Sequence, residues 1–423
     1  MGVLEELQWR GFVHQATHED LAQRLEGAPL TFYCGFDPTA DSLHVGSLLP
    51  IFAMAHLQRA GHRPLVLIGG GTGLIGDPSG KTAERTLQTK EQVLANAEGQ
   101  RRQLARFLDF EGPAAARMLN NADWLLSLTL VDFLRDIGKH FSINVMLTRE
   151  SVRMRLEDRE HGLSYTEFSY TLLQAYDFLH LCEHQNCRLQ IGGSDQWGNI
   201  VSGMDLTRRL LQKETYGMTV PLLTKPDGSK FGKSEGGNIW LDPARTSPYK
   251  FYQFWINHPD AEVVRYLRFF TFLSRSEIEA LEEAVLNVPE KREAQRRLAE
   301  EVTRIVHGEE ALRNAVKASE AMFGGALDGL DEPTLLDVFS EVPSTTLPAE
   351  TLEIQPLLTD VLVEAGCFPS KGEARRMIKS GGLYVNNERI EREDLRLSRD
   401  LCLTPSMAVV RKGKKHYQLL RFQ

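Results

Sequence analysis

Short apolar runs alternate with glycine-rich turns along the first part of the chain. Residues 30–34 and 64–68 are apolar runs of strand length, and residues 188–191 form a third run that ends at two glycines. Apolar positions between the first two runs recur at helical spacing: Leu48, Ile51, Phe52 and Ala55. The order strand, helix, strand predicts a parallel α/β sheet, which binds its ligands at the carboxyl ends of the strands.

Other parts of the chain have a helical pattern. Residues 122–142 and 168–181 have the apolar character of buried helices, and from residue 247 to about 323 the sequence is helical and strongly charged. Residues 324–353 collect Gly, Pro, Ser and Thr, which is typical of a linker. We therefore expect a separate small domain to begin near residue 354.

The length of the chain and its distribution of charge refine this picture. A chain of 423 residues exceeds what one hydrophobic core usually organises, which favours two or three domains. The formal net charge is −8, but residues 356–423 hold 13 Lys and Arg against 8 Asp and Glu. Because a basic tail follows an acidic body, a nucleic-acid partner stays open despite the negative total.

Composition also bears on compartment and metal binding. Acidic residues precede any apolar run at the N-terminus, no apolar segment reaches the length of a membrane span, and the five cysteines form no CxxC pair. We therefore expect a cytoplasmic protein with reduced thiols. His180, Cys182, His184 and Cys187 lie close together in sequence, but their spacing fits no standard zinc motif, so we expect no tightly bound metal.

The segment GGGTGLIGDPSGKT, residues 69–82, resembles two nucleotide-binding motifs at once. Residues 71–76 match the dinucleotide fingerprint G-x-G-x-x-G, whereas residues 76–82 are one residue too short for a P-loop. A dinucleotide site also requires an acidic residue about twenty positions later at a strand end. Glu98 instead lies in a polar helical stretch, so we reject a dinucleotide-dependent oxidoreductase.

Two further segments carry residue types suited to phosphate chemistry. In YCGFDPTADSLHVGSLLP, His44 and Gly46 lie at the predicted start of a helix, where free backbone N–H groups and the helix dipole attract phosphate. In KPDGSKFGKS, Lys230 and Lys233 lie on a polar loop, and lysines that close over a triphosphate neutralise the charge of its leaving group. Taken singly, the two segments could be an ordinary strand-to-helix turn and a solvated loop.

Together, these segments resemble the signatures of class I aminoacyl-tRNA synthetases. HVGS and KFGKS have the order and the predicted elements of the HIGH and KMSKS signatures. Longer segments are similar to bacterial tyrosyl-tRNA synthetases over essentially the whole chain: YCGFDPTADSLH, GLIGDPSGK, FSYTLLQAYDF, QIGGSDQWGNI and KFGKSEGG. The resemblance implies that a homodimer activates L-tyrosine with ATP, accompanied by Mg²⁺, and transfers it to tRNA(Tyr).

The resemblance also implies a fold. It is an α/β fold, with a Rossmann-like parallel-sheet catalytic domain, then an α-helical domain and a small α+β RNA-binding domain. The catalytic domain is expected over residues 1–230, with an inserted dimer-interface segment at about 118–185. The KFGKS loop and the helical domain on the anticodon side follow over 231–325, a linker over 326–353, and the RNA-binding domain over 354–423.

Six positions match the residues with which this family binds tyrosine. An enzyme that selects tyrosine over phenylalanine needs buried partners for the phenol hydroxyl, because those partners are left unpaired by the wrong substrate. The resemblance assigns Tyr33 and Asp177 to the hydroxyl, Asp77, Tyr170 and Gln174 to the ammonium group, and Gln196 to the carboxylate. Without the resemblance, each would pass as an ordinary core tyrosine, helix cap or satisfied amide.

The resemblance likewise implies an ATP site. The positions expected around the nucleotide are Cys34, Gly35, Asp37, Gly46, Ser47, Gly193 and Asp195. Thr39 and His44 are expected to hold the terminal phosphates, while Lys230 and Lys233 stabilise the departing pyrophosphate. Ser47 stands where the signature usually has a second histidine, so a hydroxyl, a water or nothing replaces the contact of that imidazole.

Basic residues in two places are candidates for RNA binding. Lys81 and Arg85 follow the glycine-rich segment and resemble the family's contact with the acceptor stem. In the tail, Lys371, Arg375 and Lys379 are four residues apart, which puts them on one helix face suited to a phosphate backbone. Either set could instead be an ordinary solvated surface.

Rival interpretations depend on a few positions. A tryptophanyl enzyme shares the catalytic core but gives no reason for both Tyr33 and Asp177, and a non-catalytic RNA-binding relative would lack the phosphate-handling residues that this chain retains.

Two further segments depart from a simple interpretation. The KMSKS methionine and first serine are replaced by Phe231 and Gly232. The apolar segment 124–134 could be core, but the resemblance favours the dimer interface.

Overall fold

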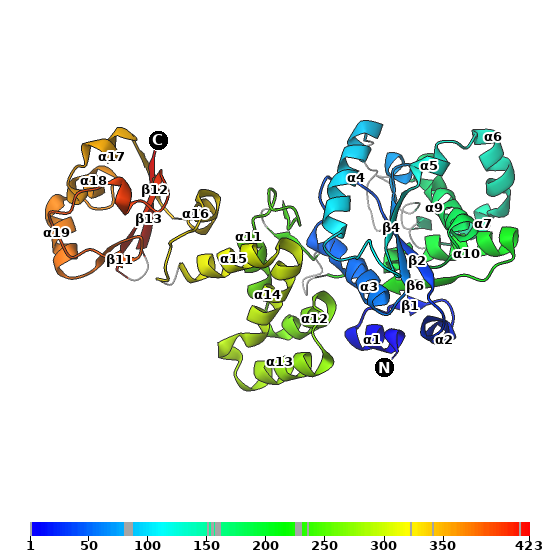
Figure 1. The fold of residues 1–423 in the computed structure, drawn as a ribbon. Helices are drawn as coiled ribbons and strands as arrows, with labels where there is room; N and C mark the ends of the chain where they lie inside the picture. Colours follow the sequence, from blue (N-terminus) through cyan, green and yellow to red (C-terminus); the bar gives the residue numbers. More distant parts are fainter. Residues whose placement is uncertain are drawn as a thin grey trace. The chain divides into compact units, whose positions relative to one another are not determined.

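The computed structural model describes most of the chain. It describes residues 2–423 apart from 80–87, 150–151, 154–155, 157–161, 225–230, 235–236, 322–323, 341 and 414–415, and only the backbone of residues 233 and 234. The chain forms two compact units (Figure 1), which are Met1–Asp242 with Pro259–Ala294, and Pro243–His258 with Gln295–Gln423. Each unit has its own sheet.

A six-stranded sheet organises the first unit. Its strands lie in the order β1 (Gln15–Ala16), β6 (Tyr216–Val220), β5 (Cys187–Gly193), β2 (Thr31–Phe36), β3 (Arg63–Ile68) and β4 (Arg117–Asn120). Only β1 pairs in the antiparallel sense, so the prediction of a parallel α/β sheet is confirmed. Because the order of connection reverses between β2 and β5, the carboxyl ends of these strands form the crevice where such sheets bind ligands.

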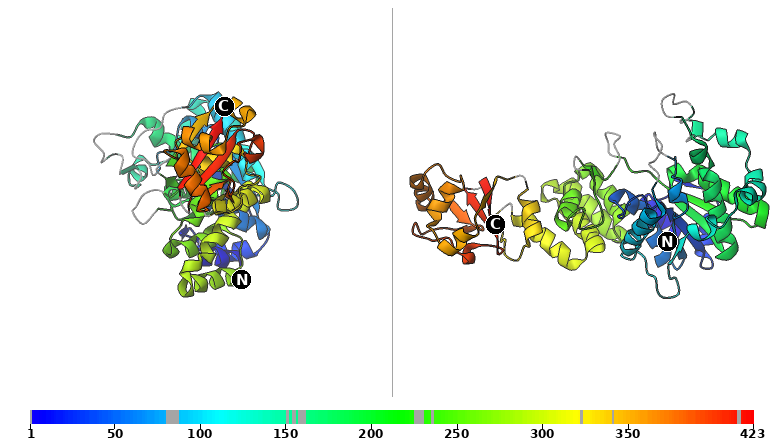
Figure 2. Two further views of the ribbon diagram at one scale, coloured as in Figure 1. Left: turned by 90° about the vertical axis from the view of Figure 1, so that its left-hand side faces the viewer. Right: turned by 90° about the horizontal axis from the view of Figure 1, so that it is seen from above.

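Helices cover the sheet on both faces (Figures 1 and 2). α3 (Leu48–Arg59) contacts β3, β5 and β6, while α9 (Tyr165–His184) and α10 (Trp197–Leu211) pack on each other and against β5. α3 is apolar nearly all round because α1 (Val3–Arg10) and α12 (Asp260–Phe270) contact it as well. α9 begins at a capping box between Ser164 and Glu167, and it contains the helix predicted over residues 168–181.

The remaining elements of the first unit are short or peripheral. They are α2 (Leu21–Glu26), α4 (Lys90–Leu104), α5 (Ala122–Leu125), α6 (Leu130–Asp132), α7 (Ile143–Leu147), α13 (Arg275–Asn287), β7 (Lys233–Ser234) and β8 (Gly237–Asn238). The helical pattern predicted over 122–142 is largely confirmed, since α5 is followed by a break at residues 126–129 and then by α6, the π-helix η3 (Phe133–Ile137) and the 3₁₀ turn η4 (Gly138–His140) without interruption. Short 3₁₀ turns follow β2, β3 and β5: η1 (Val45–Ser47), η2 (Thr72–Leu74) and η5 (Ser194–Gln196).

The second unit joins helices to a five-stranded sheet. Its helices are α11 (Pro248–Ile256), most of α14 (Glu293–His307), α15 (Glu309–Ala321), α16 (Glu332–Val338), α17 (Glu350–Ile354), α18 (Leu358–Glu364) and α19 (Lys371–Lys379). The strand order is β11 (Glu388–Arg389), β10 (Leu383–Val385), β12 (Met407–Lys412), β13 (His416–Phe422) and β9 (Ser344–Leu347). Among the described helices of either unit, none has the length and apolar character needed to cross a bilayer.

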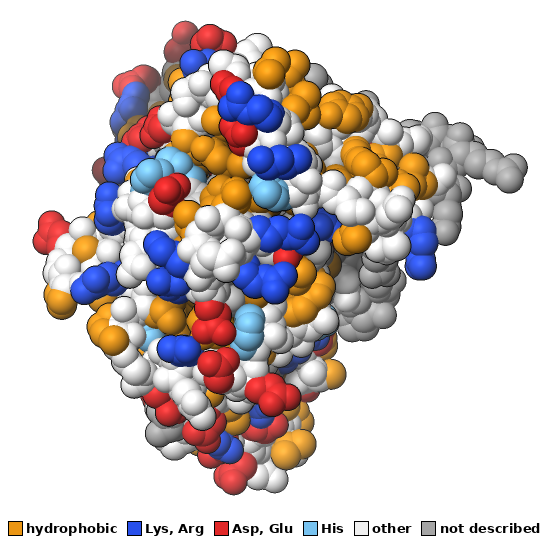
Figure 3. All heavy atoms as spheres, turned by 90° about the vertical axis from the view of Figure 1, so that its right-hand side faces the viewer, with side chains coloured by type: hydrophobic (Ala, Val, Ile, Leu, Met, Phe, Trp, Pro, Cys, Tyr) orange, Lys and Arg blue, Asp and Glu red, His pale blue; other side chains and the backbone are white. Residues whose placement is uncertain are grey.

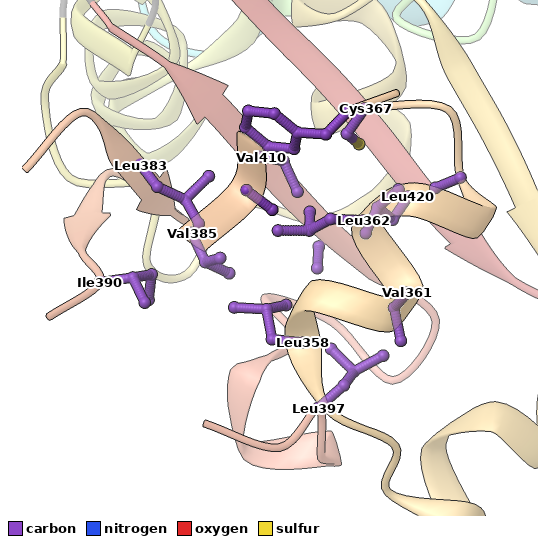
Figure 4. Close-up of a cluster of buried hydrophobic side chains, with 14 of the residues drawn as sticks. Leu358, Val361, Leu362, Cys367, Leu383, Val385, Ile390, Leu397, Val410 and Leu420 are labelled. Carbon is purple, nitrogen blue, oxygen red and sulfur yellow. The ribbon is translucent and has the colours of Figure 1, made fainter. Parts of the chain in front are cut away.

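The C-terminal sheet is buried on both faces. One face packs Leu383, Val410 and Leu420 against Leu362 of α18 and its neighbours (Figure 4). Tyr417 belongs to a second cluster, which includes residues of α15 and α16. The sheet is therefore the middle layer of a helix–sheet–helix arrangement.

Residues 326–353 differ from the linker that their composition suggested. This segment contains α16 and the strand β9, which pairs in parallel with β13. Leu335, Phe339 and Leu347 are buried. The burial of these three apolar side chains stabilises the segment, which its Gly, Pro and Ser content did not indicate. The segment is therefore part of the second unit, while the domain boundaries expected from the sequence stay predictions.

Candidate active site

A cavity of about 590 Å³ lies at the carboxyl ends of β2 and β5. Its volume is in the range of small-molecule sites. It brings together sequence-predicted residues from segments far apart in the chain: Tyr33, Cys34, Gly35, Asp37, Thr39, His44, Ser47, Asp77, Tyr170, Gln174, Asp177, Gly193, Asp195 and Gln196. The predicted residues of the first unit therefore converge on one site wherever their side chains are described, apart from Gly46.

Tyr33 presents a buried hydroxyl to this cavity. Its ring packs against Phe178 with 5.3 Å between ring centroids, and the residue is 1% exposed. In the described part of the chain the hydroxyl has no hydrogen-bond partner. A buried polar group that lacks a partner costs about 1–3 kcal/mol. A ligand hydroxyl that pairs with Tyr33 would remove this cost.

The Asp177 carboxyl is held from two sides. Asn121 donates from Nδ2 to one oxygen at 2.9 Å, and Trp124 donates from Nε1 to the other at 2.7 Å. Burial raises the pKa of this carboxyl to about 7, although both donors act to lower it. The group therefore titrates near neutral pH, where it can either accept a hydrogen bond from a ligand hydroxyl or donate one to it.

A carboxylate and several amide side chains form a second cluster of polar residues in the site. Gln196 donates from Nε2 to Asp77 at 2.7 Å, and Gln174 donates from Nε2 to the Gln196 amide oxygen at 3.1 Å. Asn199 Nδ2 donates to the Gln174 oxygen at 3.0 Å. The other oxygen of Asp77 accepts the backbone N–H of Ser79 at 2.9 Å. One carboxylate with amide acceptors nearby suits a ligand ammonium group.

The glycine-rich segment supports Asp37 rather than forming a dinucleotide loop. The Thr72 hydroxyl donates to one oxygen of Asp37 at 2.9 Å, and the Tyr170 hydroxyl donates to the other at 2.9 Å. A Cβ on Gly69 would lie 2.1 Å from the Asp37 carboxylate, so the turn approaches this side chain as only glycine allows. Burial raises the pKa of Tyr170 well above its usual value, and the neighbouring Asp37 charge adds to this effect.

His44 precedes the turn η1 and lines the cavity. Its Nδ1 accepts the backbone N–H of Gly46 at 3.0 Å, so the neutral ring carries its proton on Nε2 and can donate it to an anion. A Cβ on Gly46 would lie 2.7 Å from Cε1 of this ring. Gly46 does not line the cavity, and it acts on the site by supporting the imidazole.

The KFGKS segment is anchored against the HVGS turn. Phe231 is buried and stacks on Phe270 of α12, with 5.8 Å between ring centroids. Gly232 has a φ of +80°, and a Cβ there would lie 2.4 Å from Cγ2 of Val45. The two residues that depart from KMSKS are therefore packing residues, and the glycine is required by both its φ and its neighbour.

The residues expected around a nucleotide have distinct environments. Burial raises the pKa of the Cys34 thiol to about 12, so this side chain is protonated at neutral pH. A Cβ on Gly35 would meet no heavy atom within 4 Å, whereas a Cβ on Gly193 would lie 2.5 Å from Asp195. Gly193 thus permits a close turn into η5, which carries Asp195.

Some predicted residues cannot be placed. Lys81, Arg85 and Lys230 lie outside the described residues, and Lys233 is described only as backbone in β7. In the second unit, Lys371 and Lys379 lie on α19, where they form ion pairs with Asp360 at 2.9 Å and Glu393 at 3.3 Å. Arg375, also on α19, is exposed.

Sequence reasoning missed the residues that orient Asp177. Asn121 had no distinguishing pattern, and Trp124 was assigned with its neighbours to the dimer interface. That assignment is wrong for Trp124, which is 9% exposed and stacks on His180 while its indole N–H binds Asp177. A buried Trp needs a partner for its N–H, and this rule was the one available signal.

Comparisons with known proteins agree with this geometry. Residues 25–324 match the family of class I tRNA synthetases (W and Y), and residues 334–420 match the tyrosine–tRNA ligase SYY-like C-terminal domain. The tyrosine–tRNA ligase of Roseiflexus castenholzii is 54% identical over 421 residues, 99% of each chain. The enzyme of Geobacillus stearothermophilus is 53% identical over 425 residues, 100% of each chain.

Solved structures give the same result. A C-terminally truncated mitochondrial tyrosyl-tRNA synthetase of Aspergillus nidulans aligns with a TM-score of 0.67 and 32% identity, covering 74% of this chain and 92% of that one. A tryptophanyl-tRNA synthetase of Encephalitozoon cuniculi, at 15% identity and a TM-score of 0.52, shares the fold over 73% of this chain and 87% of its own. The chain belongs to the class I tRNA synthetases for tryptophan and tyrosine, and within them to the tyrosine–tRNA ligase family.

Proposed function

We infer that this chain is an ATP-dependent tyrosine–tRNA ligase that activates L-tyrosine and transfers it to the 3′-terminal adenosine of tRNA(Tyr). In the first step a carboxylate oxygen of tyrosine attacks the α-phosphate of ATP, and pyrophosphate leaves. In the second, a ribose hydroxyl of the tRNA attacks the tyrosyl carbonyl, and AMP leaves. The observation that carries the inference is a cavity lined by the Tyr33 and Asp177 side chains at one position and by His44 at another, in a chain of this family.

Tyrosine recognition is assigned to the polar groups described above. The Tyr33 hydroxyl, which has no partner among the residues that the structure describes, and the Asp177 carboxyl receive the phenol hydroxyl of the substrate. Phenylalanine would leave the Tyr33 hydroxyl buried without a partner and would give the Asp177 carboxyl, which Asn121 and Trp124 already hold, no further hydrogen bond; this is the proposed basis for rejecting it. Asp77, Tyr170 and Gln174 receive the ammonium group, and Gln196 receives the carboxylate.

ATP handling is assigned to the HVGS turn and to the lysine loop. His44 donates from Nε2 to a phosphate oxygen, Thr39 acts beside it, and Lys230 and Lys233 neutralise the departing pyrophosphate. Cys34, Gly35, Asp37, Gly193, Asp195 and Ser47 surround the rest of the nucleotide. Among the described residues no group of three His, Cys, Asp or Glu side chains could hold a metal. Mg²⁺ is therefore expected to enter with the phosphates of ATP.

The proposed assembly includes tRNA and a second copy of the chain. Lys81 and Arg85 would contact the acceptor end, and Lys371, Arg375 and Lys379 would contact RNA from the second unit. Hydrophobic side chains gather on the face shown in Figure 3. Exposed ones on α6 and α7 include Leu130, Val131, Ile143 and Val145, which supports a homodimer. The cytoplasm, where charged tRNA is consumed, is the proposed compartment.

Aminoacylation tests this function directly. Purified chain, ATP and a tRNA(Tyr) transcript are incubated with labelled tyrosine, phenylalanine or tryptophan. We expect label only from tyrosine, in a product that is lost when the 3′-terminal ribose is first oxidised with periodate. Transfer of tryptophan, or label on an oxidised transcript, would overturn the proposal.

A further inference from the structure

The loop that carries Thr39 and leads to His44 has no regular secondary structure. Residues 37–43, between β2 and η1, belong to no helix or strand. A group that stabilises a transition state must nevertheless be held close to its productive position, because a displacement of about 1 Å lowers the rate strongly. Other elements must therefore fix this loop.

The helix α4 supplies hydrogen bonds to the first half of the loop. Asn96 donates from Nδ2 to the carbonyl of Pro38 at 2.9 Å, and Gln100 donates from Nε2 to the carbonyl of Ala40 at 3.2 Å. Both amide side chains are 2% exposed. Buried amide N–H groups are stabilised by pairing, and here both amide nitrogens donate to the loop backbone.

The second half of the loop is held in the same way. Gln103 donates from Nε2 to the Ser42 hydroxyl at 2.9 Å, and its Oε1 accepts the backbone N–H of Leu43 at 2.8 Å. Just before α4, Gln88 donates from Nε2 to the carbonyl of Thr39 at 2.9 Å. The loop is thus bound at both sides of Thr39 and immediately before His44.

Gly99 lets the helix approach this closely. Positions 96, 99, 100 and 103 fall on one face of α4. A Cβ on Gly99 would lie 2.0 Å from the backbone oxygen of Asp41, an atom that no side-chain rotation can move away. Glycine weakens a helix relative to alanine. The glycine at position 99 is therefore explained by the close approach of the loop backbone, because it brings no stability to the helix itself.

We propose that Asn96, Gly99 and Gln103 are positioning residues for tyrosine activation, because they hold residues 37–43 where Thr39 and His44 meet the phosphates of ATP. The proposal rests on the roles proposed above for Thr39 and His44. Gln100 shares the face, but it also lines the cavity, so replacing it would not separate positioning from direct contact.

The test uses the neutral variants Asn96→Leu, Gln103→Met and Gly99→Ala of the full chain. Tyrosine-dependent pyrophosphate exchange gives kcat and the KM for ATP, equilibrium dialysis gives tyrosine affinity, and thermal unfolding gives stability. Gln58→Met is the matched control, because Gln58 donates to the carbonyls of Asp109 and Ala114, which do not line the cavity. Leu104→Ala, which empties a buried site on α4, controls for lost stability.

We expect each of the three positioning variants, Asn96→Leu, Gly99→Ala and Gln103→Met, to lower kcat at least about tenfold while tyrosine affinity stays within about twofold. Gln58→Met and Leu104→Ala should keep kcat near wild type. Thr39→Ala and His44→Ala are the reference variants for direct contact, since both should lower kcat. If the reference variants lower kcat and the positioning variants do not, the positioning proposal is overturned and the proposed function stands. If neither reference variant lowers kcat, the phosphate roles themselves are wrong. A loss of kcat in Leu104→Ala equal to that of the positioning variants would also overturn the positioning proposal.

Discussion

The Asp177 carboxyl lines the cavity and is held there by two residues that no sequence motif indicated. Its two oxygens are occupied by Asn121 and Trp124, and these donors fix the direction in which the carboxyl faces Tyr33 and the cavity. Burial has a larger effect on this carboxyl than the two donors have, and it raises the pKa of Asp177 to about 7. On the role proposed for Asp177, specificity for a phenol hydroxyl depends on a group that is costly to ionise.

The raised pKa of Asp177 predicts a pH-dependent stability. In the unfolded chain this carboxyl has a pKa near 3.9, so between about pH 4 and pH 7 the unfolded state releases a proton that the folded state keeps. Its contribution to the free energy of unfolding therefore falls as pH rises through this window, by up to about 4 kcal/mol. Asp177→Asn removes the titration.

Urea unfolding at several pH values measures this effect. We expect the stability of Asp177→Asn relative to wild type to rise between pH 4.5 and pH 7 and to level off above pH 8. Tyr170→Phe serves as a control, because a phenol whose pKa is raised above its usual value has no titration in this window. A stability difference that is constant with pH would contradict the assigned titration.

The sequence predicted the residues that line the site better than the residues that support it. Tyr33, Asp77 and Gln196 were found because they stand in long segments shared with the family. Asn121 and Trp124 were missed, because a donor for a buried carboxyl is chosen by distance in the folded chain and not by spacing in the sequence. Sequence motifs indicate residues whose chemical type the reaction requires, whereas the residues that hold them in place are determined by packing in the folded chain.

At the scale of elements, two loops from distant parts of the chain form one structure. The backbone N–H of Val45 donates to Ile239 at 3.0 Å, and that of Ile239 donates to Gly232 at 2.9 Å. The HVGS turn and the KFGKS segment are therefore joined by backbone hydrogen bonds and by the contact of Gly232 with Val45. The order of the two motifs was evident from the sequence, but their contact was not.

Replacing Gly232 should disturb both loops at once. Gly232→Ala forces a residue with a Cβ into a φ of +80° and brings that Cβ against Val45. We expect kcat for pyrophosphate exchange to fall at least about tenfold with little change in the KM for tyrosine. Gly237→Ala is the matched control, since Gly237 has a φ of +105° but no heavy atom within 4 Å of its would-be Cβ. Equal losses in the two variants would show that backbone strain alone is responsible.

Three central strands of the first unit were predicted closely from the sequence. The apolar runs at 30–34, 64–68 and 188–191 coincide with β2, β3 and β5, because central parallel strands are buried on both faces. The apolar stretch 122–142 is helical as predicted, but its helix is interrupted at residues 126–129. Several of its hydrophobic side chains, including Leu126, Leu130 and Val131, are exposed, which a periodic pattern alone could not indicate.

At the scale of the whole molecule, these exposed side chains predict self-association. Leu130 is 73% exposed and Val131 is 70% exposed on α6. We expect the wild-type chain to sediment as a dimer at micromolar concentration, and the double variant Leu130→Glu with Val131→Glu to sediment as a monomer with an unchanged circular dichroism spectrum. Leu286→Glu, at a 77% exposed site on α13, should leave the dimer intact. A wild-type monomer, or a double variant that still dimerises, would contradict this prediction.

The central claim is that this chain activates tyrosine and no other amino acid. The most direct test is ATP–pyrophosphate exchange with each of the twenty amino acids supplied singly. We predict exchange with tyrosine and only background exchange with phenylalanine and tryptophan, since a phenol hydroxyl can pair with the buried Tyr33 hydroxyl, which has no partner among the described residues. Exchange driven by tryptophan, or by none of the twenty, would contradict the claim.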